Sequence, residues 1–113
     1  MKKLPNREHA TVSAAKIRGY LLCSTHSTGQ PKAEFFASLG YTPERWERLA
    51  SDLRELGLRG DAIQVASPYG EKFRIVGRIV GPNGRAAVVL SIWIRDHDDP
   101  TPRLVTAYPA RWK

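Results

Sequence analysis

The chain has 113 residues, of which 42% are hydrophobic and 26% charged, so its length and composition fit one domain with a single core. It has 18 Lys and Arg residues against 11 Asp and Glu, and the net charge of +7 indicates either a polyanionic partner or an ordinary Arg-rich surface. The single cysteine, Cys23, excludes an internal disulfide and a multi-cysteine zinc site, and no apolar run is long enough to span a membrane. Without a secretory signal pattern at the N-terminus, we expect a cytoplasmic protein.

The N-terminal half of the chain predicts three helices. Ser13 is a candidate N-cap for the first helix, because its hydroxyl can accept a hydrogen bond from the first turn. Pro31 and Pro43 suit the first turns of the other two helices, and Gly40 and Gly57 suit their ends. The expected helices cover about 14–22, 31–40 and 43–56. Residues 1–12 are expected to be a loosely held N-terminal segment.

The C-terminal half changes to a strand-like pattern from residue 61. Four strands are expected near 62–66, 72–80, 85–95 and 104–108, with a strong turn signal at 81–84 between the second and the third. Helices followed by a run of antiparallel strands predict an α+β fold. We therefore expect one domain, 1–113, with a helical layer (13–57) on one face of a four-stranded antiparallel sheet (61–109).

The turn at 81–84 allows the register of the central hairpin to be argued. If Val80 faces Arg85, the residue numbers of every cross-strand pair sum to 165, and this holds whether the loop has two or four residues. One face then combines Phe73, Ile75, Gly77 and Ile79 with Ala86, Val88, Leu90, Ile92 and Ile94, and it must be the core side. The opposite face combines Arg74, Val76, Arg78, Ala87, Val89, Ser91, Trp93 and Arg95.

Arginines around an aromatic side chain on a sheet face can pair with phosphates and stack on bases. We therefore predict an RNA-binding surface at Arg74, Arg78, Trp93 and Arg95. The alternative is an ordinary solvent-facing sheet surface with Trp93 partly covered by a loop.

No strong catalytic motif is present, and neither a metal nor another cofactor is expected. His26 lies in a polar loop of small residues, and Lys32 follows at the start of the second helix. Thr106 and Tyr108 share one face of the last strand and offer two hydroxyls. These four residues are the candidate catalytic group, because metal-free RNA cleavage needs a base, an acid and cations around the phosphorus. The alternative for His26 is a surface histidine without a task, and Thr106 and Tyr108 fit an ordinary strand.

Several short motifs resemble a bacterial family catalogued as a domain of unknown function. They are Leu4-Pro5-Asn6, His26-x-x-Gly29-x-x-Lys32-Ala33-x-Phe35-Phe36-x-x-Leu39-Gly40, Gly81-Pro82-Asn83-Gly84-Arg85, Trp93-Ile94 and Arg103-Leu104-Val105-Thr106-Ala107-Tyr108-Pro109. This resemblance covers nearly the whole chain and implies no established activity.

The order of elements is also similar to the barnase–EndoU–colicin–RelE superfamily of toxin ribonucleases. That resemblance rests on layout: helices before a curved sheet, a loop histidine, a lysine at a helix start and a closing strand with Thr and Tyr. It implies metal-free RNA cleavage and neutralisation by an immunity or antitoxin protein. It also implies His26 as acid or base, Lys32 with Arg74 or Arg78 as phosphate clamps, and Thr106 and Tyr108 as helpers on the strand.

Two hypotheses follow. The first is a metal-independent endoribonuclease toxin of a toxin–antitoxin or contact-dependent system, with RNA as substrate and an acidic antitoxin or immunity protein as partner. The second is a non-catalytic module that binds nucleic acid or protein. They differ in one structural requirement: catalysis needs His26, Lys32 and Thr106 or Tyr108 to lie around one cleft.

Overall fold

The computed structural model describes residues 2–23, 25, 30–68 and 70–110. The helical elements are η1 (Arg7–His9), α1 (Ala14–Lys16), η2 (Ile17–Leu21), α2 (Gln30–Ser38), η3 (Pro43–Arg45) and α3 (Trp46–Arg59). The strands are β1 (Ala62–Val65), β2 (Glu71–Val80), β3 (Ala86–Arg95) and β4 (Arg103–Pro109). None of the helices within these residues is long and apolar enough to cross a membrane.

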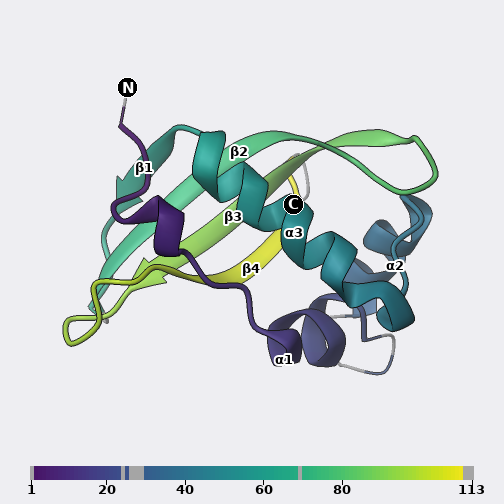
Figure 1. The fold of residues 1–113 in the computed structure, drawn as a ribbon, viewed down its shortest axis with the longest axis horizontal. Coiled ribbons are helices and arrows are strands. Elements are labelled where there is room, and N and C mark those ends of the chain that lie inside the picture. The colour runs from purple at the N-terminus through teal and green to yellow at the C-terminus, as the bar shows by residue number, and fades with distance from the viewer. Residues whose placement is uncertain (1, 24, 26–29, 69, 111–113) are drawn as a thin grey trace.

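The four strands form one antiparallel sheet in the order β1-β2-β3-β4. Helix α3 packs across one face of this sheet, and α1 and α2 lie beside the β4 edge (Figure 1). Leu49, Leu53 and Leu56 of α3 are fully buried against this inner face of the sheet, as the apolar spacing of three and four residues requires. The predicted α+β architecture is therefore confirmed.

The N-terminal segment is held firmly to the domain, so the expectation of a loose segment at 1–12 is wrong. Leu4 and Ala10 are buried in the core, with exposed fractions of 1% and 3%. Thr11 pairs in parallel with Arg103 of β4, and its backbone donates to Pro102 O and accepts from Leu104 N. A buried leucine and a strand-like pairing together fix a segment that local sequence alone describes as polar.

The helix ends agree with the predictions in one case and not in another. Gly40 ends α2 with φ 95°, and the backbone N–H groups of Gly40 and Tyr41 donate to Ala37 O and Phe36 O, a Schellman motif. Gly57 does not close α3, which continues to Arg59. A Cβ atom at Gly57 would lie 2.8 Å from Trp93 Cζ2, so this glycine serves close packing of the indole against the helix.

The register of the β2–β3 hairpin differs from the prediction by one residue. Val80 pairs with Ala86, so paired positions sum to 166, and Gly81 N donates to Arg85 O. The loop proper has three residues, 82–84, and Gly84 adopts φ 87°, which suits glycine. Because side chains alternate along a strand, this odd-numbered loop reverses the faces predicted for the whole of β3.

The reversal moves Trp93 into the core. Its side chain is fully buried (0% exposed), and its Nε1 donates to Ser91 Oγ, which donates in turn to Ile75 O. The prediction that Trp93 binds RNA is therefore wrong, because no face of the indole is accessible to a base. The face that turns away from α3, called here the outer face, combines Arg74, Val76 and Arg78 of β2 with Val88, Leu90 and Ile92 of β3.

Candidate functional site

Two of the four predicted catalytic residues, Lys32 and Thr106, contact Tyr20 of η2, and a third, Tyr108, contacts Lys32. The Tyr20 hydroxyl is 3.1 Å from Thr106 Oγ1 in a hydrogen bond that either group can donate. Lys32 Nζ lies 5.3 Å from the centre of the Tyr20 ring and 5.9 Å from the centre of the Tyr108 ring. Lys16 Nζ lies over the Tyr20 ring as well, again at 5.3 Å. These five residues are called the tyrosine–lysine cluster.

The backbone around Tyr20 explains how it reaches β4. The first helix is α-helical only over Ala14–Lys16 and continues as one π-helical stretch, in which Leu22 N donates to Ile17 O. Ile17 and Leu21 are fully buried and anchor this stretch in the core. Tyr20, between them, is only half-buried, so its hydroxyl extends to the sheet edge. Such π-helical turns occur often at functional sites.

A bulge in β4 gives Thr106 its orientation. Thr106 pairs with Ile92, whereas Leu104 pairs with Trp93, so the register shifts between these pairs and Val105 is the extra residue. Leu104 is buried on the inner face, while Thr106 and Tyr108 share the outer face with Ile92 and Leu90. The prediction that Thr106 and Tyr108 share one face is confirmed.

The lysines make the Tyr20 phenol a stronger acid than an ordinary tyrosine. Burial alone would raise the pKa of Tyr20. Hydrogen bonding to Thr106 and Lys32, with the positive charges of Lys32 and Lys16, outweighs burial and lowers that pKa below the usual value of 10.0. Each interaction between a cation and an aromatic ring within about 6 Å also contributes about 0.5–1 kcal/mol at such partly exposed sites. The cluster can therefore hold an anion and exchange a proton at the Tyr20 oxygen.

The remaining predicted site residues do not all join this cluster. His26 lies outside the described residues. Arg74 and Arg78 are exposed on the outer face of β2. Arg95 is on the inner-face register at the end of β3, where its guanidinium pairs with Glu71, so the four predicted RNA-binding residues do not share a surface.

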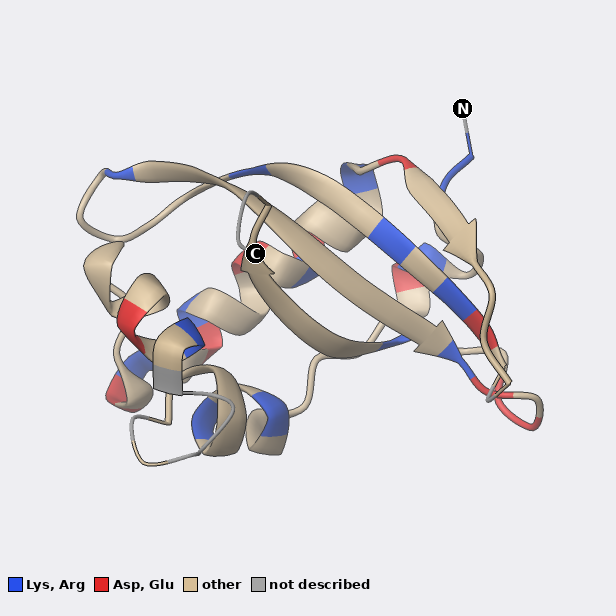
Figure 2. Cartoon of the chain, turned by 180° about the vertical axis from the view of Figure 1, so that it is seen from behind, with Lys and Arg blue, Asp and Glu red and all other residues tan. Residues whose placement is uncertain are grey.

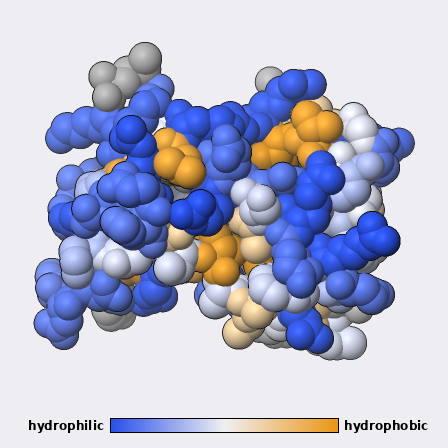
Figure 3. Space-filling view, in the orientation of Figure 1, coloured by the Kyte–Doolittle hydropathy of each residue, from blue (hydrophilic) through white to orange (hydrophobic). Residues whose placement is uncertain are grey.

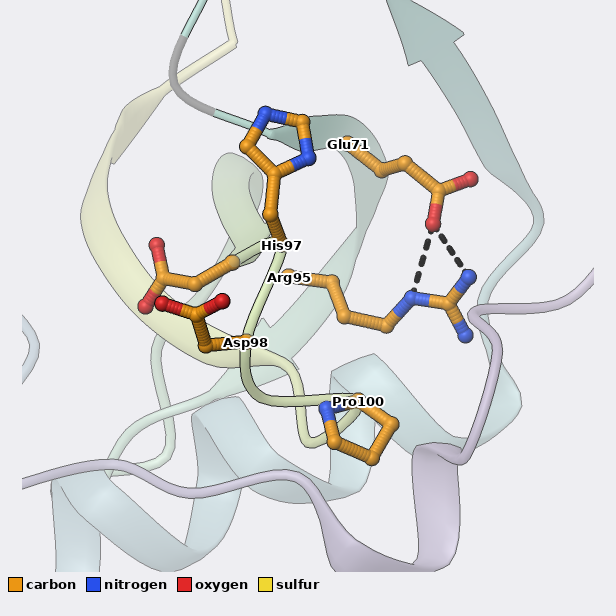
Figure 4. A pocket seen from close by; sticks show the side chains of 6 residues that line it. Glu71, Arg95, His97, Asp98 and Pro100 are labelled. Carbon is orange, nitrogen blue, oxygen red and sulfur yellow. Dashed lines mark hydrogen bonds and ion pairs between the residues drawn. The ribbon is translucent and has the colours of Figure 1, made fainter.

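A separate pocket of ≈360 Å³ lies at the end of β3, lined by Glu71, Arg95, Asp96, His97, Asp98 and Pro100 (Figure 4). In the close-up, Arg95 extends to Glu71, and the side chains of His97 and Asp98 project from the following loop. Asp96 pairs with Arg103. Among the residues that the structure describes, no group of three His, Cys, Asp or Glu side chains is arranged to hold a metal ion. This pocket contains none of the tyrosine–lysine cluster.

Comparison with known families places nearly the whole chain in one of them. The family described as Domain of unknown function (DUF6883) matches residues 3–111. The chain belongs to this family. Among the curated proteins, no match was found for the DUF6883 chain.

The fold of the DUF6883 chain also occurs in a solved structure. A chain of the "Contact-dependent growth inhibition toxin - immunity protein complex from Klebsiella pneumoniae 342" is similar to it with a TM-score of 0.72. The alignment covers 94% of this chain and 97% of the other, with 18% sequence identity. At that identity the likeness shows a shared fold over the full length of both chains.

Sequence reasoning missed two members of the cluster in the DUF6883 chain, Lys16 and Tyr20. A signal was present, because residues four apart on a helix lie on the same side, and Lys16 precedes Tyr20 by four. What the spacing does not show is that the same side of this helix meets the β4 edge. Only the tertiary fold, in which α1 and α2 lie against β4, brings Tyr20 to Thr106.

Proposed function

We propose that the DUF6883 chain is a metal-independent endoribonuclease that acts as the toxin of a toxin–antitoxin or contact-dependent system. The observation that supports this proposal most is the tyrosine–lysine cluster: two phenols, one hydroxyl and two ammonium groups around a half-buried site. The net charge of +7 suits an RNA substrate. The shared fold with a chain of a toxin–immunity complex is consistent with a toxin system.

The proposed reaction is attack of the ribose O2′ on the adjacent phosphorus. The O2′–P bond forms and the P–O5′ bond breaks, a base takes the O2′ proton, and an acid gives a proton to the leaving O5′. The products are a 2′,3′-cyclic phosphate and a 5′-hydroxyl. Tyr20 and His26 are proposed as the two proton-transfer groups, because an imidazole exchanges protons near neutral pH and the lowered pKa of Tyr20 makes its phenol a stronger acid than an ordinary tyrosine.

The other cluster residues support this chemistry electrostatically. Lys16 and Lys32 are proposed to stabilise the negative charge that develops on the phosphorane oxygens. Thr106 positions the Tyr20 hydroxyl through its hydrogen bond, and Tyr108 is proposed to contact the phosphate. Arg74 and Arg78 are proposed to bind flanking phosphates, since both are exposed on the outer face that Thr106 and Tyr108 share.

A second candidate function is a non-catalytic module that binds nucleic acid or protein. The observation that favours it is the exposed outer face of β2 and β3, which combines cations with apolar side chains. In that case the tyrosine–lysine cluster would hold a phosphate without cleaving it.

The test is an RNA cleavage assay with purified chain on total RNA and transfer RNA, with and without a metal chelator. We expect cleavage that the chelator does not reduce, with a 2′,3′-cyclic phosphate end. Lys32→Ala and His26→Ala are expected to lower the rate by at least about 100-fold, the usual range for lost acid–base or charge stabilisation. Arg45→Ala, at an exposed position on η3, is the control and should cleave like the wild type.

Three results would contradict this function. They are failure of the folded wild-type chain to cut either RNA, cleavage that the chelator abolishes, and full activity of Lys32→Ala. The first would leave the binding module as the better candidate.

A further inference from the structure

The outer face of the sheet is exposed along β2 and over the first half of β3, whereas Ile92 and Ile94, farther along β3 on the same face, are buried. Seen from behind, strands β2, β3 and β4 run across the front, with the helices at the side or behind them (Figure 2). The β3 ribbon carries no charged residue over most of its length, whereas β2 beside it carries several Lys and Arg residues. On the opposite, helix-bearing side, hydrophilic residues dominate and apolar ones show only as separate patches (Figure 3).

Apolar side chains are exposed on this face as a group. Among the described residues, all four large hydrophobic side chains that are exposed lie on it: Ile63, Val76, Val80 and Val88, at 53%, 45%, 42% and 51%. Val76 pairs with Leu90, which is only half-buried, and Val88 follows Leu90 on the same face, whereas Arg78 separates Val76 from Val80 on β2. A group of exposed apolar side chains on a small domain marks an interaction site more often than single scattered ones do.

Charge on the same face has one sign. Lys72, Arg74 and Arg78 alternate with the valines of β2, and the outward-facing residues of β2 and β3 include no acidic side chain. The matching surface must therefore combine apolar groups with negative charge. A second copy of this chain does not meet that requirement, because it would set these cations and a net charge of +7 against themselves.

The kind of apolar side chain on this face indicates whether its partner is a protein or a nucleic acid. Single-stranded RNA is held on sheets by aromatic side chains that stack on bases. The apolar outward-facing residues of β2 and β3 are all aliphatic, and Trp93, the aromatic residue of β3, is buried on the other side. Aliphatic side chains with arginines around them match the composition of a protein–protein interface.

We propose that the outer face of β2 and β3 is a docking surface for an acidic protein that sets apolar side chains against Val76, Val80 and Val88 and carboxylates against Arg74 and Arg78. Two strands of about ten residues at about 3.3 Å each, spaced about 4.8 Å apart, give this face about 300 Å². That area is less than half of one side of a standard interface, about 800 Å² per partner, so the partner has to extend onto the neighbouring strands as well. A protein seated there would border Tyr108, which lies opposite Leu90.

The experiment uses three synthetic helical peptides and amide chemical shifts of the isotope-labelled full chain. The first peptide has Leu on one face and Glu elsewhere, the second replaces Glu with Gln, and the third replaces Leu with Ser. We expect the Glu–Leu peptide to shift the amides of β2 and β3, and the other two to bind at least about tenfold more weakly, because each lacks one half of the match.

Variants of the chain locate the contact. The double variant Val76→Ser/Val88→Ser is expected to bind the Glu–Leu peptide about tenfold more weakly. The double variant Arg74→Gln/Arg78→Gln is expected to reduce the salt dependence of binding. Arg45→Gln, which removes an exposed charge on η3, is the control and should leave binding unchanged. All four substitutions on the sheet are at exposed positions, so each variant should fold.

Any one of four results would overturn the proposal. They are binding of the Glu–Leu peptide that leaves the β2 and β3 shifts unchanged, no binding at all, and tighter binding at these strands by a 2′-O-methyl RNA oligonucleotide or by anionic lipid vesicles. None of these measurements requires RNA cleavage. Loss of the ribonuclease proposal would therefore leave this inference standing. The two proposals meet only at Arg74 and Arg78, where the first places RNA phosphates, so tighter RNA binding there would support that placement and overturn this inference.

Discussion

Two tyrosines of this domain occupy opposite electrostatic surroundings. Tyr20 lies at the β4 edge between Lys16 and Lys32, and its pKa falls below the usual 10.0 although burial acts to raise it. Tyr41 follows α2, is buried, and donates its hydroxyl to Asp52 Oδ2 at 2.6 Å. Burial and the Asp52 carboxylate raise the pKa of Tyr41 well above its ordinary range, and the nearby Arg48 offsets only part of this rise.

The difference in surroundings suits Tyr41 to a structural role and Tyr20 to a chemical one. A phenol beside a carboxylate stays protonated and serves as a fixed hydrogen-bond donor, which suits a core position. A phenol beside ammonium groups is closer to losing its proton, which suits a site that exchanges protons or holds an anion. Replacing each tyrosine with phenylalanine is therefore expected to have opposite consequences at the two positions. Four measurements test this difference.

The largest expected effect is on RNA cleavage. Tyr20→Phe keeps the ring and its contacts with the lysines but removes the hydroxyl, and we expect the cleavage rate to fall at least about 100-fold. Tyr41→Phe is the matched control and should keep the rate within about twofold, because its hydroxyl faces Asp52 rather than the tyrosine–lysine cluster. Equal losses in the two variants would remove the special role of Tyr20.

The same pair of variants should differ in stability in the reverse sense. Tyr41→Phe removes a hydrogen bond to a charged group, so the free energy of unfolding should fall by about 1–2 kcal/mol. Asp52 keeps its ion pair with Arg48, which limits the loss. Tyr20→Phe, at a half-buried edge position, should change stability by less than about 1 kcal/mol. Urea unfolding followed by circular dichroism measures both, and a larger loss for Tyr20→Phe would contradict this expectation.

Tyrosine titration should show the two phenols separately. With carbon-13 at the tyrosine Cζ position, Tyr20 should ionise below pH 10 and Tyr41 well above pH 10. The lowered pKa of Tyr20 contributes stability that is present above the unfolded value near 10 and is lost as pH falls through the folded value. The raised pKa of Tyr41 contributes stability that is present below about 10 and is lost at higher pH. An order of ionisation with Tyr41 first would contradict both assignments.

The smallest effect is expected from removing one lysine charge. Lys16→Met keeps most of the side-chain volume, and Lys32, with its charge and its hydrogen bond, has the larger influence on Tyr20. The pKa of Tyr20 should therefore rise in both Lys16→Met and Lys32→Met, and more in the second. The alkaline limb of the cleavage–pH profile should follow that shift. A pKa that does not change in Lys32→Met would show that the lysines do not set the acidity of Tyr20.

The sequence by itself was sufficient for the features that depend on local pattern. Proline and glycine positions predicted where α2 begins and ends, and the alternation in β2 predicted that Phe73 and Ile75 face the core. The same period of two placed Thr106 and Tyr108 on one face. Lys32 and these two hydroxyls were predicted from their positions in a helix start and a last strand, and the structure brings them together around Tyr20.

Other features were decided by the tertiary structure. A loop of three residues, 82–84, rather than the two or four expected, reversed every side chain of β3; Gly84, in the left-handed conformation, is the local feature that suits this length. Gly57 was predicted to end a helix. In the structure it allows the indole of Trp93, a residue 36 places later, to pack closely against the helix. Tyr20 reaches Thr106, a residue 86 places later, only through the tertiary fold. Periodicity acts over a few residues and is visible in sequence, whereas contacts between distant segments depend on how the whole core closes.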